Sequence, residues 1–464
     1  MGQLGAAPPY RLEPRLLVLG GGLLLAACLV GALAAIDPKL GLAAGIGIAF
    51  VLLVLADLAA GLCVFALVSF LDVLPFGGAA LTFSKAVGLL LAASFVAVLV
   101  TRDDSVNDFL SDRPVVSMVL IGYVVWALLS FSWAEDPGTT LDTVFRIAPN
   151  VLLFLIVYTA IRTRRHAVWL AGALIVGAGI SALYGLLGPG DVAPANEIER
   201  LGGAVGNANE QSAVAVVALA LAAAFAAGWR GSPFVRVAST MAIVLAGAGV
   251  LLSLSRGGLL ALAAALVAAV AFGGRWRPAA AILALCLALV SVGYFVAVAG
   301  PDERARVTDL EGGTGRSDIW TVGLRMVEVQ PVLGVGAGNF PVASIHYLLE
   351  PGAIYRDEFI VDDAKVAHNM YLDVLAETGI VGLALFVAIL AFAVIVALRA
   401  ARRFMEAGDR RMELLSRALA VALVSLLVAD FFSSGQFSKQ LWLLLALAPA
   451  LYRIAVAHPE PEGA

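Results

Sequence analysis

Charge is scarce in this sequence. Only 14% of its 464 residues are charged while 61% are hydrophobic, and the mean hydropathy is +0.96. About a quarter of the residues of a soluble domain are charged, so this composition excludes an ordinary soluble protein and indicates a membrane protein. The formal net charge of −4 is small. No basic patch with interleaved aromatic residues is present, which excludes nucleic acid as a partner.

Cysteine is also rare. The three cysteines, Cys28, Cys63 and Cys286, all lie inside apolar runs, so their spacing suits neither a metal site nor a disulfide framework. The first apolar run, near residues 16–36, lacks a small-residue cleavage site followed by a polar mature domain. We therefore expect this run to be a retained first span and not a removed signal peptide.

Long apolar runs make up most of the chain. A helix needs about 20 apolar residues to cross the hydrocarbon core, and fourteen runs are candidates. They lie near residues 16–36, 41–56, 58–74, 80–100, 114–134, 141–161, 167–187, 211–229, 237–254, 257–273, 279–299, 376–398, 414–432 and 441–457. The sequence therefore predicts an all-α membrane protein with about 14 transmembrane helices, eleven in residues 1–299 and three in residues 376–464.

Arginines in short loops predict the direction of the spans, because they favour the cytoplasmic side. If all fourteen runs cross the membrane, six groups of arginines fall on one side. These groups are Arg11 and Arg15; Arg102 and Arg113; Arg162, Arg164 and Arg165; Arg230 and Arg236; Arg275 and Arg277; and the arginines from Arg399 to Arg417. Both termini are then cytoplasmic, whereas residues 188–211, the turn at Arg256 and residues 300–375 face outward.

Residues 300–375 are too polar to face lipid and too short for an independent enzyme domain, so we expect a helical extracytoplasmic cap. Within it, the sequence predicts a helix that is capped by Ser317 and ends before Pro331. Arg325 lies off the apolar face of this helix, and the glycine-rich stretch 334–339 is typical of a flexible turn. The apolar face is predicted from five residues at helical spacing: Ile319, Trp320, Gly323, Leu324 and Val327.

Arg256 lies in a turn between two apolar runs, on the side where short-loop arginines are disfavoured. No carboxylate is near in sequence, so this arginine either snorkels, pairs with a distant acid or binds an anion. A guanidinium group suits phosphate because its planar fork donates two hydrogen bonds, and Gly257-Gly258 would let a phosphate approach the backbone. Lys85 and Arg146, near the outer ends of their spans, either widen this cationic pocket or act as snorkelling anchors.

His368 is one of only four histidines. Its ordinary pKa of about 6.5 lets it accept a proton at neutral pH, although a lone histidine at a membrane interface is often structural. It opens a predicted helix that continues through Glu377 to a break at Gly379. Asn207 and Asn209 open the eighth span, where they either contact sugar hydroxyls or cap the helix.

Three motifs occur in the order Ser253-Leu-Ser-Arg256-Gly-Gly, then Gly315-Arg316-Ser-Asp-Ile-Trp320 leading to Gln330-Pro-Val-Leu-Gly-Val-Gly336, then His368-Asn369 with nine residues before Gly379-Ile-Val-Gly382. With these motifs, the sequence resembles the O-antigen ligase/polymerase family of bacterial glycan-assembly membrane enzymes, most closely over residues 205–395. Leu383 stands where the ligases usually have threonine, and fourteen spans exceed the dozen typical of ligases. Both departures favour a polysaccharide polymerase.

The resemblance implies a GT-C-like, metal-independent glycosyltransferase of the bacterial inner membrane, with no cofactor and a periplasmic site. Its donor would be a glycan on undecaprenyl pyrophosphate, its acceptor a glycan or a lipid, and a chain-length regulator is a candidate partner. By analogy, Arg256 and Arg316 would grip the pyrophosphate while His368 orients or deprotonates the acceptor hydroxyl. The acidic pair Asp362-Asp363 is interpreted as solvated loop. Supporting substrate contacts are expected from Lys85, Arg146, Asn207, Asn209, Arg325, Asn369 and Glu377.

Two alternatives remain open at this point. A ligase that attaches finished glycan to a lipid A core would use the same chemistry and the same motifs. A secondary transporter or lipid-linked-sugar flippase would also have many spans and intramembrane cations. Transporters tend to show paired halves with broken helices in matching positions, and this sequence shows no such repeat.

Overall fold

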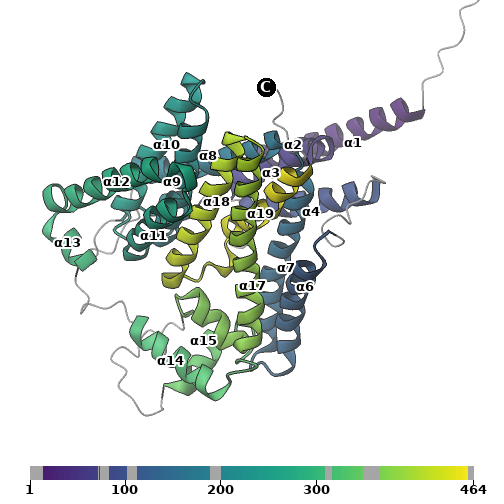
Figure 1. Cartoon of the computed structure of the whole chain (residues 1–464). Helices are drawn as coiled ribbons and strands as arrows, with labels where there is room; N and C mark the ends of the chain where they lie inside the picture. The colour runs from purple at the N-terminus through teal and green to yellow at the C-terminus, as the bar shows by residue number, and fades with distance from the viewer. Residues whose placement is uncertain are drawn as a thin grey trace, which may run out of the picture.

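The computed structural model describes residues 14–71, 73, 83–101, 112–188, 200–308, 316–348 and 365–457. All regular structure in these residues is helical (Figure 1), and each of the fourteen predicted spans falls on a helix. The helices are α1 (Pro14–Ile36), α2 (Pro38–Ala56), α3 (Leu58–Val68), α4 (Phe83–Thr101), α6 (Pro114–Leu129), α7 (Pro137–Ala160), α8 (Arg164–Leu187), α9 (Ala208–Gly228), α10 (Pro233–Leu252), α11 (Arg256–Phe272), α12 (Arg277–Ala297), α17 (Met370–Glu406), α18 (Arg410–Ala429) and α19 (Lys439–Ala457).

Ten of these helices, some with an adjoining turn, are long and apolar enough to cross a membrane. The other four form shorter apolar helices, over residues 24–36, 58–68, 84–97 and 256–272. The all-α membrane class is thus confirmed. The number of helices that span the membrane stays a prediction.

Capping side chains and prolines determine where the helices begin, because the first four backbone N–H groups of a helix lack intrahelical partners. The Thr163 hydroxyl accepts a hydrogen bond from the backbone N–H of His166 at 3.2 Å, at the start of α8. At the start of α18, the Asp409 carboxylate accepts one from Met412 N–H at 3.0 Å. Proline occupies the first turn of α6, α7 and α10, where its missing N–H costs nothing.

Helices α9, α18 and α19 form the centre of the bundle. Between 67% and 78% of the residues in their apolar segments are buried, whereas none are buried in α12 at the periphery. α18 packs against α9, α11 and α17, and α17 also packs against α19 (Figure 1). Because α9 has 21 residues, its two ends are about 30 Å apart.

Four of the six arginine groups meet at one end of the bundle. Arg164, Arg230, Trp276 and Arg410 line a single cavity there, and they come from the connections at the ends of α8, α9, α11 and α17. The predicted topology requires these four arginine groups to lie on the same side of the membrane. The face of the membrane to which this end belongs stays a prediction.

In the described part of the predicted cap there are three short helices and a 3-10 turn: α13 (Pro301–Thr308), α14 (Arg316–Val329), α15 (Phe340–Ala343) and η4 (Ser344–Tyr347). α14 and α15 lie at the lower end of the bundle in Figure 1, beside the start of α17. They share with α17 an apolar core separate from that of the bundle. This cap core consists of Ile319, Val322, Met326, Val335, Phe340, Ala343, Ala367, Leu372 and Ala376.

The helix α14 corrects two details of the sequence prediction. It begins at Arg316, so Ser317 lies in its first turn and is not its cap. Its buried face is also rotated, because Leu324 is 54% exposed while Val322 and Met326 are fully buried against the start of α17.

The stretch 334–339 is tightly packed, and its prediction as a flexible turn was wrong. The buried Asn339 side chain accepts a hydrogen bond from Asp136 N–H at 2.8 Å and donates one to Thr140 Oγ1 at 2.9 Å. Gly338 has φ +78°, and a Cβ there would collide with Thr143. Glycine is therefore needed so that the cap can dock on the turn between α6 and α7.

Candidate functional site

Arg256 is the first residue of α11, and Ser255 caps the helix by accepting a hydrogen bond from Gly258 N–H at 3.2 Å. The half-buried Arg256 side chain reaches across to α13, where its Nε and Nη2 donate to the carbonyl oxygen of Arg306 at 2.9 and 2.7 Å. This bidentate contact fixes the guanidinium plane at the junction of the bundle with α13.

The turn before Arg256 is held from α9. Asn209 Oδ1 accepts hydrogen bonds from Ser255 Oγ at 2.8 Å and from Arg200 at 3.0 Å, and Arg200 Nε also donates to Ser253 O at 2.9 Å. Leu254 has φ +47°, an uncommon conformation for a residue with a side chain. The turn that presents Arg256 is therefore defined by contacts from outside the motif.

The glycines after Arg256 have a different role from the predicted one. A Cβ on Gly258 would collide with Ser212 of α9, and one on Gly257 would lie 3.2 Å from Phe432 Cβ. Both glycines are buried, so a phosphate cannot approach their backbone. They allow α11 to pack closely against α9 and the end of α18, which corrects the expectation drawn from the sequence.

The residues before and after His368 are both fixed by hydrogen bonds. Asn369 caps α17 by accepting hydrogen bonds from Tyr371 and Leu372 N–H, both at 3.1 Å. Ala367 O accepts a hydrogen bond from Trp320 Nε1 at 2.9 Å. His368 has φ +49°, and histidine tolerates this left-handed region better than most side chains. Its half-buried ring has no hydrogen-bond partner among the described residues.

The structure brings the three predicted catalytic residues together at one end of the bundle, although they come from α11, α14 and the start of α17. Burial and the positive charges of Arg316 and Lys365 lower the pKa of His368. Burial and the guanidinium groups of Arg256 and Arg306 lower the pKa of Arg316. Mutual repulsion of this kind makes the cluster favourable for a multiply charged anion. We call Arg256, Arg306, Arg316, Lys365 and His368 the cationic cluster.

An apolar cavity of about 390 Å³ lies at the same end, between the start of α17 and the end of α18. Its lining includes Tyr371, which follows the cap of α17, and Phe432, which contacts Gly257 beside Arg256. Trp320 of α14 packs edge-on against Phe431, with ring centroids 5.6 Å apart. Positive charge and apolar surface therefore adjoin at this end of the bundle.

The break in α17 that the sequence predicts is present at Gly379, which has φ +65°. A Cβ there would collide with the carbonyl of Val332, and the adjacent Ile380 N–H donates to Pro331 O at 2.9 Å. A Cβ on Gly334 would in turn collide with the backbone of Glu377. The glycines of the second and third motifs thus interlock, and they fix the cap on α17. The first helical part of α17 ends at Thr378, ten residues after His368.

Besides Asn209, four of the predicted substrate-binding residues have structural contacts. Asn207 caps α9 by accepting a hydrogen bond from Asn209 N–H at 2.8 Å, and Asn369 caps α17. The buried Arg325 guanidinium donates to Tyr347 O at 2.6 Å. Glu377 is buried and accepts a hydrogen bond from Phe340 N–H at 3.4 Å. These contacts support roles in positioning the turn, the cap and α17.

The surroundings of Arg146 and Lys85 differ from each other. The Arg146 guanidinium is 3.9 Å from the Phe437 ring centroid, and it interacts electrostatically with the buried carboxylates Asp373 and Glu377. Lys85 is exposed near the start of α4, which packs against α2, α3 and α7. A wider pocket that includes Lys85 and Arg146 stays a prediction.

Sequence reasoning missed Arg306 and Lys365, since isolated basic residues in a polar segment follow no motif. It also missed Asp373, which accepts hydrogen bonds from Gln436 Nε2 at 2.7 Å and from Ala367 N–H at 3.4 Å. A buried aspartate five residues after the histidine was the available signal. No group of three or more metal-ligating side chains occurs in the part of the chain that the structure describes, and Asp362-Asp363 lies outside the described residues.

The fold and this site define a helical membrane protein with a cationic cluster at one end of its bundle. A family model described as O-antigen ligase (Wzy_C) matches residues 241–387. The matched segment runs from α10 into α17 and contains Arg256, Arg316 and His368. Over this segment the chain is similar to the O-antigen ligase family, and this match confirms the resemblance found in the motifs. No curated protein matches the chain.

Proposed function

We propose that this protein transfers glycan from a polyprenyl (undecaprenyl) pyrophosphate donor to an acceptor hydroxyl on the extracytoplasmic face of the bacterial inner membrane. The observation that carries the proposal is the convergence of Arg256, Arg316 and His368 from three separate elements. The similarity to the O-antigen ligase family supports glycan assembly in a membrane. The cationic cluster adds the chemistry that a pyrophosphate leaving group requires.

In this reaction the bond between the anomeric carbon and the pyrophosphate oxygen breaks, and the electron pair leaves with the pyrophosphate. Negative charge therefore grows on the leaving group in the transition state. Arg256 and Arg316 stabilise that charge, and such preorganised electrostatic stabilisation is usually the largest catalytic contribution. The contact of Arg256 with Arg306 O holds its guanidinium in place before the donor arrives. The two arginines supply the role that a metal ion has in other transferases.

His368 takes the acceptor proton. The acceptor oxygen attacks the anomeric carbon, a new glycosidic bond forms, and the hydroxyl proton passes to the imidazole. A base must be neutral to do this, and burial with the nearby charges of Arg316 and Lys365 lowers the pKa of His368. The ring is thus neutral at pH 7, and it has no competing hydrogen-bond partner among the described residues.

The apolar cavity beside Tyr371 and Phe432 accommodates the first isoprene units of the donor. A lipid-linked pyrophosphate is an amphiphile, so a site for it requires adjacent cationic and apolar surfaces. This adjacency favours the transferase over a transporter, whose substrate site typically lies near the bilayer midplane between repeats.

We favour a polymerase over a ligase because Leu383 replaces the usual ligase threonine. Deletion of the gene separates the two activities. A polymerase mutant would accumulate single repeat units on the carrier or the surface, whereas a ligase mutant would accumulate long unattached chains. Long unattached chains would show that the protein is a ligase, which would use the same site.

Reconstitution in liposomes tests the transferase itself. Purified protein supplied with a polyprenyl-pyrophosphate oligosaccharide and an acceptor should form a new glycosidic bond and release polyprenyl pyrophosphate. Movement of the intact donor across the bilayer without bond formation would instead establish a flippase. A chain-length regulator, if it is a partner, should change the product length and not the formation of the bond.

A further inference from the structure

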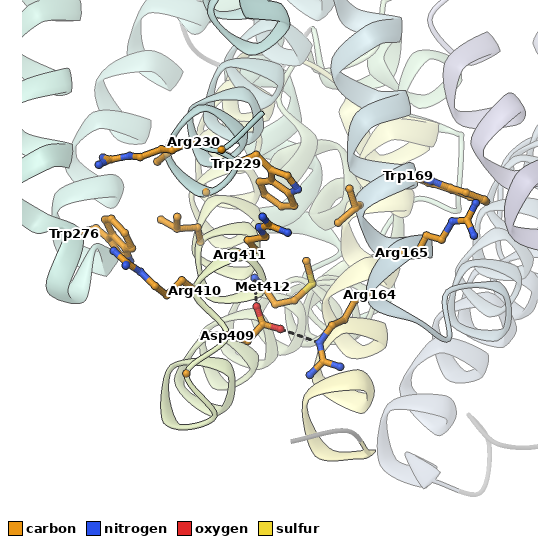
Figure 2. A pocket seen from close by; sticks show the side chains of 16 residues that line it. Arg164, Arg165, Trp169, Trp229, Arg230, Trp276, Asp409, Arg410, Arg411 and Met412 are labelled. Carbon is orange, nitrogen blue, oxygen red and sulfur yellow. Dashed lines mark hydrogen bonds and ion pairs between the residues drawn. The ribbon is translucent and has the colours of Figure 1, made fainter. Parts of the chain in front are cut away.

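Another cavity, which is polar and has a volume of about 640 Å³ (Figure 2), lies at the opposite end of α9 and α18 from the cationic cluster. Five of its sixteen lining residues are arginines and one is an aspartate. The lining comes from the start of α8, the end of α9 with the connection after it, the turn before α12, and the start of α18 with the connection before it. We call this cavity the arginine pocket, defined by Arg164, Arg165, Arg230, Arg410, Arg411 and Trp276.

The only acid in the lining of this cavity is already engaged. Asp409 accepts a hydrogen bond from Arg164 Nε at 2.8 Å, and its other oxygen caps α18 (Figure 2). The other four arginines of the pocket have no carboxylate partner among the described residues. All four are exposed and line the cavity, so the cavity is strongly positive. These arginines are Arg165, Arg230, Arg410 and Arg411.

Tryptophans hold three of these guanidinium groups. Arg411 lies over the Trp229 ring at 5.5 Å, Arg410 over Trp276 at 5.2 Å and Arg165 over Trp169 at 4.2 Å. All three rings line the pocket. Tryptophan and arginine together are typical of the level of the lipid head groups in a bilayer.

An apolar groove continues from the pocket along the helices. The groove has a volume of about 160 Å³ and shares Ala227, Trp276 and Leu414 with the arginine pocket. Half of its lining residues are alanines, from α9, α11, α12 and α18. We call it the alanine groove, defined by Ala224, Ala227, Ala265, Ala280, Ala284 and Ala418. Because the alanine side chains are small, they leave a groove in this apolar surface.

We propose that the arginine pocket and the alanine groove bind one anionic phospholipid, with the phosphate among the arginines and an acyl chain in the groove. A soluble phosphate would use the pocket but would gain nothing from the groove. Basic pockets between helices on the cytoplasmic side are suited to anionic head groups, and the distribution of arginines predicts that this end faces the cytoplasm. The site lies about 30 Å from the cationic cluster, one helix length away.

Lipid binding to the full-length protein in detergent, measured by native mass spectrometry, tests this proposal. The probes are dioleoyl phosphatidylglycerol, dioleoyl phosphatidylcholine and inorganic phosphate. The wild-type protein should retain phosphatidylglycerol in preference to phosphatidylcholine. The double variant R230Q/R411Q should bind phosphatidylglycerol about 30-fold more weakly, because each basic residue near an anionic lipid contributes about 1 kcal/mol.

The matched control is R399Q/R402Q, which removes two exposed arginines at the same end that do not line the pocket. Its affinity for phosphatidylglycerol should equal that of the wild type. If both double variants lose affinity equally, the arginines act through general surface charge and the site assignment fails.

A second pair of variants tests the groove. Ala284→Leu fills the groove from α12 and should weaken phosphatidylglycerol binding about tenfold, while Ala281→Leu, on the exposed side of the same helix, should not. Because α12 is peripheral, both variants should fold. Unchanged binding in Ala284→Leu, inorganic phosphate that displaces the lipid completely, or a preference for polyprenyl phosphate over phosphatidylglycerol would each overturn the proposal.

Discussion

His368 combines a left-handed backbone with a half-buried ring that lies near two positive charges. If it removes the acceptor proton, His368→Ala should lower the rate of glycan transfer about 10²–10⁴-fold, the usual contribution of a general base. Expression and membrane insertion should be normal. His346→Ala is the control, because His346 is exposed and, among the described residues, its side chain bonds only to Glu135 in the turn between α6 and α7, at 2.8 Å. Equal activity in His368→Ala and the wild type would show that His368 is not the general base.

The pH profile is a separate prediction for the same residue. Because burial and the charge of Arg316 lower the pKa of His368, the acid limb of kcat/KM, which reports the free enzyme, should lie below about 6.5. As pH falls through the lowered pKa, the ring gains a proton and activity is lost. Bound pyrophosphate opposes the arginine charges, so the acid limb of kcat should lie at higher pH than that of kcat/KM. Identical limbs would show that the donor phosphates lie far from His368.

Arg256 should not tolerate lysine. Its Nε and Nη2 together hold the Arg306 carbonyl, and an ammonium group cannot reproduce this planar fork. Lysine keeps the charge but loses the preorganised orientation of the donors, which should lower kcat about 10²–10³-fold. Arg399→Lys, at the other end of the bundle, serves as the control, and both variants are measured in the liposome transfer assay. Wild-type kcat in Arg256→Lys would show that only charge is needed.

The sequence singled out candidate site residues, whose roles stay a prediction, but it did not predict their surroundings. Arg256, Arg316 and His368 were identified through motif order and family resemblance, and the structure then placed them together. Arg306 and Lys365 could not be found, because their relevance depends on a tertiary arrangement of α13, α14 and the start of α17. The role of Gly257-Gly258 was wrong for the same reason, since Ser212 and Phe432 are distant in sequence.

At the scale of elements, α17 determines where the site is. Its first turns bring His368 to the cap, its break at Gly379 receives the loop after α14, and the rest of it crosses the bundle. Hydropathy and a glycine predicted this helix and its break. The docking of residues 334–339 on the α6–α7 turn was not predictable, because Asn339 and Asp136 pair across 203 residues.

Gly379→Ala should therefore loosen the cap. The residue has φ +65°, and a Cβ would collide with the Val332 carbonyl, so the substitution should cost more than about 1 kcal/mol. Thermal unfolding of the detergent-solubilised protein and limited proteolysis of the cap measure the effect. Gly172→Ala in α8 is the control, since nothing lies within 4 Å of a Cβ at that position. Equal stability of the two variants would contradict the interlocking of cap and α17.

In the whole molecule, two groups of basic residues lie at opposite ends of the helical bundle. Arginine-rich connections meet at one end, where they form the arginine pocket, and the cationic cluster lies with the cap at the other end. The class of fold was predictable because apolar runs of this length have few alternatives in a membrane. The packing order, with α9, α18 and α19 at the centre and α12 at the edge, was not, because all these runs are similarly apolar.

Topology is the prediction at this scale. A reporter fused after Gly408, beside the arginine pocket, should read cytoplasmic, and one inserted after Gly312 should read extracytoplasmic. Parallel fusions with a periplasm-active and a cytoplasm-active reporter provide the control for expression. A cytoplasmic reading at Gly312 would place the cationic cluster on the wrong side for an externally presented donor.

The central claim is that Arg256, Arg316 and His368 form one site for a pyrophosphate-linked glycan. A structure of the protein with a polyprenyl-pyrophosphate oligosaccharide bound tests it most directly. The account predicts phosphate oxygens within hydrogen-bond distance of Arg256 and Arg316, the anomeric carbon on the side of His368, and the isoprenoid chain beside Tyr371 and Phe432. A pyrophosphate bound in the arginine pocket, with the cationic cluster unliganded, would contradict it.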